Sequence, residues 1–436
     1  YKLIENKNNT GEIFTNIQLK NIHLERNNLT AELQVVNKNK RVVNKIKIKG
    51  YKSFPKKFIK HYLKIKKNNT LNLKAIEEKS LALGGLSFAE EIKKPEVLFK
   101  KDSSTIYLNI KKKKANEFEG FLGFTSKEES DKIELNGNIN LNLINNLNKG
   151  EELRIIYKSS ENKQKETNIR LKMPYIINSP ISITSEISIF KKDTSFTNNT
   201  QYLKIEYDLI NNLKIGAGYK TIKSNSLYDS INQQDFKTKA YSLNLSHIKP
   251  NIDEIYKYKT KTTISASING RKTDNKKTNQ QELNINSQYS FKLNNRNSIY
   301  IKTLNYYLFS KNTLDNELMY IGGINSIRGI TENSIPSSQY SILNTEYRIK
   351  LNKKLYTHTV IDYAITKNNN TNNFNKIIGF GLGFGLRTNK NILRFIIANN
   401  KTEEQKIKIN ETKIHLSLLA RFWKNKTFIN KVLKKK

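Results

Sequence analysis

The sequence predicts a transmembrane β-barrel of sixteen antiparallel strands that follows a small α+β module. Between Phe118 and Phe422 the helical period disappears, and apolar residues alternate with polar ones in about sixteen short segments. The connections between these segments alternate between short and long, as they do in barrels that cross an outer membrane. The region before them, residues 42–112, combines helical and strand periods within a short stretch, which is typical of a compact α+β module.

The composition bounds the class of protein. The chain has 436 residues, enough for one large barrel with a small module or for two or three ordinary domains. Its 77 Lys and Arg outnumber 38 Asp and Glu, and the formal net charge of +39 suggests an anionic partner such as nucleic acid or lipid headgroups. The lysines are spread along the chain, and Asn and Ile are also abundant. The coding bias of an AT-rich genome is therefore the alternative explanation.

The sequence has few metal-binding residues and no candidate membrane-spanning helix. Zero cysteines exclude disulfides and thiolate metal sites, and they suit an oxidising envelope compartment. The five histidines are scattered without ligand spacing, so we expect no metal and no cofactor. No apolar run is long enough for a membrane helix, although alternating barrel strands never form such a run. The chain begins at Tyr1 with neither an initiator Met nor a signal peptide, which suggests a processed or trimmed product.

The first 112 residues predict one complete module and part of another. Residues 1–40 carry two strand-like runs, and we interpret them as the end of a module whose beginning is missing. These runs are Phe14–Leu24 and Leu29–Val36. The complete module is predicted in the order strand, helix, helix, strand, strand. Its segments are Val42–Lys49, Phe54–Ile65, Leu73–Leu83, Phe88–Phe99 and Thr105–Lys112.

The barrel strands are predicted from alternation and from the lengths of their connections. In Ile181–Ile189 four isoleucines face one side, and Ser, Thr and Glu face the other. Similar segments are Lys132–Leu143, Gln201–Tyr207, Tyr241–Leu245, Thr262–Ile268 and Lys413–Phe422. Short connections include Asn145–Gly150, Leu209–Leu213, Leu293–Asn297 and Asn352–Lys354, and long ones include Ser224–Asp235, Gly270–Gln281, Phe309–Gln339 and Lys367–Asn375. An even strand count returns the C-terminus to the side of the N-terminal module.

One long connection, residues 309–339, carries the most unusual local sequence, and we call it loop six. Within it Gly322, Gly323 and Gly329 surround a single arginine, Arg328. Glycines let a backbone adopt unusual angles and press against a wall, and an arginine between them is a fixed fork for a carboxylate. The combination indicates a loop folded back into a cavity. A glycine-rich hairpin with a solvated arginine is the alternative.

At this point the chain resembles the outer membrane protein 85 superfamily, the assembly and secretion barrels with N-terminal POTRA modules. Val43–Lys112 resembles a POTRA module, through the Gly50-Tyr51 turn and the Phe54-Pro55 helix start. Residues 116–123 resemble the entry into the first barrel strand. The stretch 322–329, with Gly322, Gly323, Ser326, Arg328 and Gly329, matches the family's Arg-Gly-aromatic loop, except that Ile330 replaces the aromatic residue.

The resemblance implies that the arginine of this loop pairs with an acidic residue on the inner barrel wall. Two residues match that role, Asp362 on strand thirteen and Glu346 on strand twelve. Strand parity turns both inward, because Tyr347 and Ile361 are expected to face lipid. We predict a pair between Arg328 and Asp362, with Glu346 as the second neighbour. A bidentate pair in a partly dry lumen would hold the loop far better than an exposed pair.

The resemblance also implies a seam between the first and last strands. Residues 414–422 resemble the closing strand that ends in an aromatic, Phe422. On the first strand we assign Phe118, Gly120 and Gly123 to the seam, because glycines weaken a strand. The predicted domains are 1–40 (the end of a POTRA module), 41–114 (a POTRA module), 115–422 (the barrel) and 423–436 (a basic tail). The tail is expected to be disordered, or to sit at the membrane interface through Trp423.

No enzymatic function is expected. The sequence has no Gly-x-Ser-x-Gly elbow and no phosphate-binding loop, and its aromatics fit a bilayer belt better than a nucleic-acid groove. The family implies a protein-handling barrel in the outer membrane of a Gram-negative bacterium, or in that of an organelle. Its POTRA strand edges, Lys45–Lys49 or Thr105–Lys112, would capture unfolded clients in the periplasm. The expected partners are client proteins, outer-membrane lipids, and accessory lipoproteins or chaperones. Insertion of clients, dedicated secretion of one passenger, and a passive channel or adhesin remain open alternatives.

Overall fold

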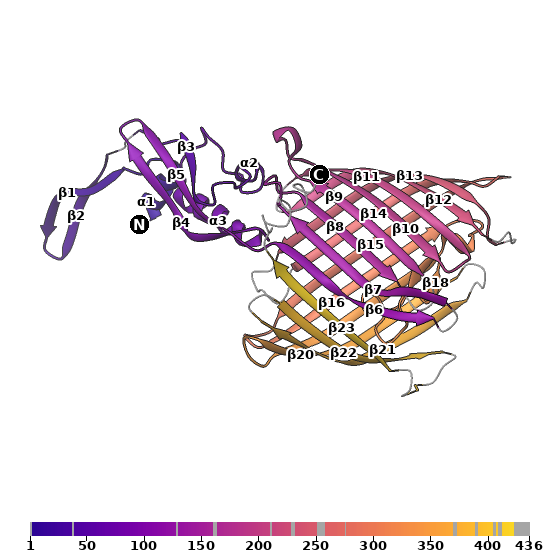
Figure 1. The fold of residues 1–436 in the computed structure, drawn as a ribbon. Coiled ribbons are helices and arrows are strands. Elements are labelled where there is room, and N and C mark those ends of the chain that lie inside the picture. Colours follow the sequence, from indigo (N-terminus) through magenta and orange to yellow (C-terminus); the bar gives the residue numbers. More distant parts are fainter. Residues whose placement is uncertain are drawn as a thin grey trace. The chain divides into compact units, whose positions relative to one another are not determined.

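The computed structural model describes most of the chain as two compact units, Tyr1–Lys113 and Lys114–Lys436. Figure 1 draws their helices and strands as a ribbon. The predicted tail, 423–436, lies outside the described residues. Those residues are 2–36, 39–127, 130–159, 164–209, 212–227, 232–250, 258–274, 276–368, 373–388, 391–403, 407–408 and 412–422, with only the backbone described for 121–137.

The first unit contains a three-stranded sheet with two helices. Its strands are β3 (Lys45–Gly50), β4 (Ala89–Lys100) and β5 (Ser103–Lys112), in the order β3-β5-β4. β3 pairs with β5 in parallel and β4 pairs with it antiparallel. The prediction that Thr105–Lys112 offers an open strand edge is therefore wrong, because both sides of β5 are already paired. β3 and β4 are the edges of this sheet.

The two helices of this unit differ in how well their bounds were predicted. α2 spans only Lys57–His61, shorter than the predicted Phe54–Ile65. It ends early because Lys64 adopts a left-handed backbone with φ +54°, which a helix does not continue through. α3 (Leu73–Leu81) begins at the cap residue Asn72, whose side-chain oxygen accepts a 2.9 Å hydrogen bond from the Ala75 N–H. A 3-10 turn, η1 (Ala82–Gly85), follows it.

The predicted turn residues of this module build its core. Gly50 has φ +91°, and a Cβ there would lie 2.5 Å from the carbonyl oxygen of Ile110, so only glycine fits. Tyr51 and Phe54 are 6% and 3% exposed, and Pro55 is also buried. The Phe54 ring centroid lies 6.0 Å from that of Phe88, and the Tyr51 N–H donates a 2.9 Å hydrogen bond to the carbonyl oxygen of Ile110 on β5. The turn thus fastens the start of the helical region to the sheet.

The beginning of the first unit holds one more helix and a hairpin. α1 (Lys2–Asn9) was not predicted, because its sequence is short and polar. β1 (Asn16–Glu25) and β2 (Asn28–Val36) form a separate two-stranded antiparallel sheet. They correspond to the two predicted runs. Their assignment to the end of a preceding module stays a prediction.

The second unit is a closed barrel of sixteen antiparallel strands (Figure 1). Each strand pairs with its neighbours in the chain, and β23 pairs with β6 to close the ring. The strands are β6 (Asn116–Lys127), β7 (Ser130–Ile144), β8 (Glu152–Ser159), β9 (Lys165–Met173), β10 (Ile181–Lys192), β11 (Phe196–Asp208), β12 (Leu213–Ser226), β13 (Phe236–Pro250), β14 (Tyr258–Lys272), β15 (Lys277–Lys292), β16 (Asn297–Phe309), β19 (Gln339–Lys350), β20 (Leu355–Lys367), β21 (Phe374–Arg387), β22 (Asn391–Thr402) and β23 (Lys413–Phe422). A 3-10 turn, η2 (Ile176–Asn178), lies between β9 and β10.

The predicted fold class, a sixteen-stranded barrel after a small α+β module, is confirmed. Alternation sets which side of each strand faces outward. On β19 and β20 the outward Tyr347 and Ile361 are 40% and 55% exposed, whereas the inward Glu346 and Asp362 are 8% and 0% exposed. One predicted loop, Gly270–Gln281, is wrong in length, because β14 continues to Lys272 and β15 begins at Lys277. No helix among the described residues is both long and apolar enough to cross a membrane.

Candidate functional site: the loop inside the barrel

Loop six connects β16 to β19 and carries its own short elements. These are the 3-10 turn η3 (Asp315–Glu317) and the strands β17 (Met319–Ile321) and β18 (Ile335–Ser337), which pair with each other. Side chains from strands around the ring reach the loop, so it lies across the lumen. Lys158 of β8 binds Glu332 at 2.9 Å, Asn198 of β11 donates to the carbonyl oxygen of Asn316, and Lys302 of β16 donates to that of Asn325.

Arg328 is the most completely bound side chain of loop six. Its Nε and Nη2 donate to the two carboxylate oxygens of Asp362, at 2.9 and 2.5 Å. Its backbone N–H donates to the same carboxylate at 2.8 Å, and Nη1 donates to Glu346 at 2.5 Å. Arg328 is 4% exposed and Asp362 is 0% exposed. A bidentate pair at this depth fixes both the position and the orientation of the guanidinium.

A second arginine balances the charge around Glu346. Arg348 Nε donates to the other Glu346 oxygen at 2.6 Å, and its guanidinium lies 4.0 Å from the ring centroid of Tyr300. His358 Nδ1 lies 3.8 Å from Glu346. We call Arg328, Arg348, Glu346 and Asp362 the arginine network: two cations face two carboxylates. Buried charges are tolerable only when they are paired in this way. Arg348 was not among the residues that the sequence predicted for this site.

The backbone next to Arg328 lies directly against the wall of the barrel. Gly329 has φ +87°, and a Cβ there would lie 2.4 Å from the carbonyl oxygen of Asn399 on β22. From the other side, a Cβ at Gly379 of β21 would lie 2.4 Å from the carbonyl oxygen of Arg328. Asn400 donates a 2.8 Å hydrogen bond to the carbonyl oxygen of Gly329. Glycine at both places allows the loop to reach Asp362. Gly379 escaped the sequence analysis, although it belongs to a Gly-x-Gly run.

The remaining residues of the motif shape the turn and its packing. Ser326 Oγ accepts a 2.8 Å hydrogen bond from the Gly322 N–H, and the Ser326 carbonyl oxygen accepts one from Asn344 at 2.7 Å. Gly322 and Gly323 have φ +124° and +88°. Ile330, which stands where the family has an aromatic residue, is 9% exposed and packs in an apolar cluster with Ile321, Ile327, Ile342, Ala364 and Ile377. Isoleucine therefore supplies a packing contact at this position.

A second buried ion pair fastens the beginning of loop six, and the sequence analysis missed it. Arg271 of β14 donates to Glu317 of η3, and the two side chains are 4% and 5% exposed. Glu317 also accepts hydrogen bonds from Gln280 at 2.9 Å and from the Leu314 N–H at 2.9 Å. Arg271 sits where Gly270–Gln281 was predicted to be a loop. The only sequence feature that could have indicated this ion pair is the inward-facing position of Arg271 in the alternation of β14.

We expect Glu317→Gln to loosen the first part of loop six. The substitution leaves Arg271 buried without its charge partner, and breaking a buried pair in this way costs about 3–5 kcal/mol. The double variant R271M/E317L should lose less, since no charge stays buried. Thermal unfolding followed by gel mobility measures both variants. E403Q, which breaks the exposed pair with Lys376, is the matched control and should change stability by about 0–1 kcal/mol. Equal effects of E317Q and E403Q would contradict the assignment.

The closure of the barrel is its shortest described ladder. β23 and β6 pair through only four residues each, 419–422 with 116–119, whereas β22 and β23 pair through eight. Phe118 is opposite Ala420, and Phe422 is opposite Asn116. The ladder ends where Gly120 follows with φ +155°, and a Cβ there would clash with the carbonyl oxygen of Asn138. Gly123 lies farther along β6, among the residues whose backbone alone is described.

The site offers charge pairing and shape, and it contains no metal-binding cluster among the residues that the structure describes. Known proteins match this chain in two comparisons, one with protein-family models and one with solved structures. The POTRA family model, described as "Surface antigen variable number repeat", matches residues 42–113. No curated protein is a significant match to the chain.

Solved structures match the chain over nearly its full length. The structure of BamA from Haemophilus ducreyi lacking POTRA domains 1–3 is 15% identical, with a TM-score of 0.56, over 97% of this chain and 92% of that one. CdiB from Escherichia coli is 12% identical, with a TM-score of 0.62, over 96% and 83%. CdiB from Acinetobacter baumannii is 15% identical, with a TM-score of 0.58, over 95% and 79%.

These findings define the chain as a POTRA-plus-barrel protein with the fold of the outer membrane protein 85 superfamily. The resemblance predicted from the Arg-Gly motif and the POTRA turn is confirmed at this level. BamA and CdiB are the particular proteins whose structures the chain resembles, and at these identities the likeness concerns the fold.

Proposed function

We propose that this protein resides in the outer membrane of a Gram-negative bacterium and assembles or exports other proteins, without enzymatic chemistry. It captures unfolded clients on the POTRA sheet and passes their strands to the barrel. The observation that carries the proposal is the short seam between β6 and β23. A closed barrel has no free edge, so four paired residues at one place make that place the easiest to open.

Opening of the seam supplies what a client strand needs in lipid. A strand entering the hydrocarbon region must have its backbone N–H and C=O groups satisfied. The unpaired length of β23 before Leu419 and of β6 after Glu119 provides an edge for such pairing. The arginine network keeps loop six docked to β19 and β20 while β23 and β6 separate. The loop then braces the lumen, and the strands on either side of the seam move.

Capture begins on the edges of the POTRA sheet. Edge strands present a row of backbone groups to which an extended chain adds by hydrogen bonding, with little demand on its sequence. β3 and β4 have this position, and β5 does not. One module therefore accepts many clients. The accessory lipoproteins or periplasmic chaperones that the family resemblance implies would deliver them.

The proposal is tested by reconstitution. The full chain is placed in zwitterionic vesicles, an unfolded outer-membrane barrel protein is added as client, and client folding is followed by its shift in gel mobility. We expect folding at least about tenfold faster than in empty vesicles, because the seam templates pairing that bare lipid cannot provide. A client that folds at the same rate in both would defeat the proposal. A client that becomes enclosed in the vesicle lumen and unfolded would instead favour dedicated secretion.

Capture on the POTRA edges gives a separate expected result. A photo-crosslinking residue placed at Lys47 of β3 or Lys93 of β4 should yield adducts with the unfolded client. The same residue at Lys60, exposed on α2, should yield few. The physical reason is that only the sheet edges offer unpaired backbone groups. Adducts of equal intensity from the helix position would indicate non-specific adhesion to a basic surface, and the edge model would be abandoned.

A further inference from the structure

The outer wall of the barrel carries a row of directly opposed lysines beside the anchored end of loop six. In the register of the sheet Lys223 of β12 is opposite Lys237 of β13, Lys237 is opposite Lys272 of β14, and Lys272 is opposite Lys277 of β15. Like charges directly opposite each other destabilise a sheet. Three such contacts in a line, on four neighbouring strands, therefore call for an anion that neutralises them.

The lysines of this row project away from the lumen. Their neighbours in sequence, Ser224, Thr238 and Arg271, are 1%, 2% and 4% exposed and face inward, where Ser224 and Arg271 contact loop six. All four lysines are exposed. In the part of the chain that the structure describes, none of them forms a salt bridge, and neither do Asp235 and Asp274 from the same hairpins. The row is an uncompensated line of positive charge.

Below the lysines the same strands change from charged to apolar in register. Two residues along each strand, Lys239 is opposite Gly270, which is opposite Asn279. Two residues farther come Tyr219, Tyr241, Ile268, Gln281 and Phe309, again side by side across five strands. Tyr241, Ile268 and Phe309 are 61%, 65% and 49% exposed. The cationic row and the aromatic and apolar row are thus four residues apart along the strands. This arrangement matches the two zones of a lipid, the headgroup and the acyl chains.

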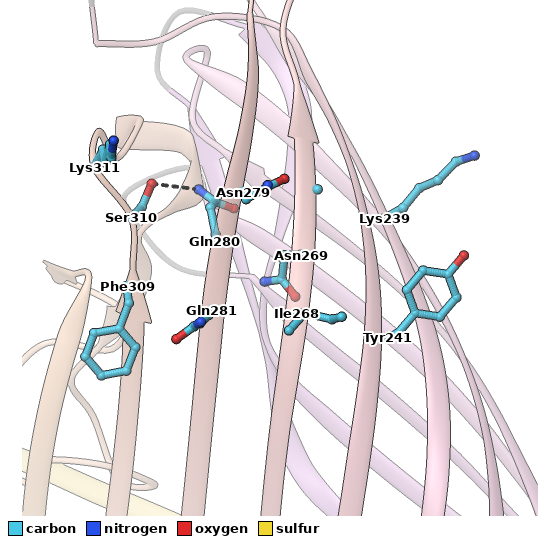
Figure 2. Close-up of a pocket in the computed structure, with 11 residues that line it drawn as sticks. Lys239, Tyr241, Ile268, Asn269, Asn279, Gln280, Gln281, Phe309, Ser310 and Lys311 are labelled. Atoms are coloured by element: carbon cyan, nitrogen blue, oxygen red, sulfur yellow. Dashed lines mark hydrogen bonds between the residues drawn. The ribbon is translucent and has the colours of Figure 1, made fainter.

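A depression lies between these rows. Its volume is about 810 Å³, and its lining includes Lys239, Tyr241, Ile268, Phe309 and Lys311. Figure 2 shows Lys239 and Tyr241 on one side and Phe309 with Lys311 on the other, with Ile268 between them. Gly270 leaves the space open, because a Cβ there would meet nothing closer than 4.0 Å. The depression is thus an opening on the outer surface of the barrel, at the position where Gly270 has no side chain.

We propose that this surface binds a lipid with a phosphate headgroup. Its phosphate lies against Lys223, Lys237, Lys272 and Lys277, its headgroup enters the depression at Gly270, and its acyl chains lie on the Tyr241–Phe309 row. The inference rests on the proposed membrane location of the barrel. It adds a lipid partner of defined chemistry to the strands that hold Arg271 and Ser224. Because these two residues contact loop six from the inner side of the same strands, the bound lipid would be linked to the anchoring of the loop.

The experiment uses the full chain in nanodiscs of phosphatidylcholine that contain a minor fraction of phosphatidic acid. Native mass spectrometry counts the lipids that stay bound after the disc is stripped. We expect phosphatidic acid to be retained preferentially. The variant K223Q/K237Q/K272Q/K277Q should retain at least about tenfold less, from the attraction that each lysine contributes near a lipid surface. The control K149Q/K292Q/K353Q/K354Q removes four exposed lysines in or next to turns at the other rim and should retain the wild-type amount.

Further arms separate the explanations. Gly270→Leu keeps every charge but fills the depression, so it should also reduce retention. Glycerol 3-phosphate has the headgroup without acyl chains, and it should fail to displace the lipid. Full displacement would assign the row to a free phosphate and overturn the proposal. If the two lysine variants lost lipid retention equally, the total charge of the protein would explain the binding, and this result would also overturn the proposal.

The unfolding temperature of the four-glutamine row variant in detergent distinguishes lipid binding from a purely structural role of the lysines, because the two roles predict opposite changes. In zwitterionic detergent the four-glutamine row variant should unfold at the same temperature as the wild type or higher, because repulsion is removed. Earlier unfolding would make these lysines structural and sink the inference. The client-folding assay in zwitterionic vesicles tests the proposed function separately. If clients do not fold faster there but phosphatidic acid is still retained preferentially, the proposed function is wrong and the lipid site stands. Failure of the chain to integrate into phosphatidylcholine discs at all would remove the membrane location.

Discussion

Arg328→Ala is expected to abolish client assembly while the barrel itself stays folded. The substitution leaves Asp362, which is 0% exposed, and Glu346 without the cation that neutralises them. Breaking a buried charge pair from one side costs about 3–5 kcal/mol, enough to shift loop six out of its docked position by two or more orders of magnitude in population. The strand ladders do not involve Arg328, so the gel mobility of the folded barrel should persist.

The expected loss is measured by client folding and by proteolysis together. Chymotrypsin should cleave at Tyr320, which in the wild type stacks on Phe190 with ring centroids 5.6 Å apart. Arg328→Lys should give a partial effect, because a point charge cannot replace the bidentate contact. Arg296→Ala, at an exposed turn, is the control. If R328A keeps both wild-type client folding and wild-type protection of Tyr320, the arginine network has no role in the mechanism.

A disulfide across the seam is expected to stop client insertion reversibly. Phe118 and Ala420 are register partners, and opposed residues in an antiparallel pair lie within disulfide range. The chain has no cysteine of its own, so F118C/A420C introduces the only pair. Once oxidised, the four-residue ladder cannot separate. Client folding should fall at least about tenfold, to the rate in empty vesicles, and it should return on reduction.

The control for this variant is a disulfide inside a long ladder. Ala217 and Leu243 are register partners on β12 and β13, within a ladder of twelve residues. A217C/L243C should leave client folding unchanged in either redox state, because that part of the wall does not open. Unchanged folding with the oxidised seam would exclude lateral opening. It would favour passage of the client through the lumen, as in the secretion alternative.

Much of the site was predictable from local sequence, because it depends on strand parity and on glycine chemistry. Alternation turned Asp362 and Glu346 inward before any partner was known, and the glycines around Arg328 indicated a loop held against a wall. The structure brings these three residues together. Arg271 and Glu317 could not be paired in this way, because 46 residues separate them and neither lies in a distinctive motif. Their contact follows only from where η3 lies in the lumen.

The same division holds for the sheets. The periods of the chain determined that alternating segments between residues 118 and 422 form strands, which side of each strand is apolar, and that the module before them has two helices. These features depend on neighbours two to four residues away. Tertiary structure alone decided that β5 lies between β3 and β4, that four residues close the barrel, and that lysines of four strands form one row. These features depend on register between distant segments, and register is set by packing of the whole sheet.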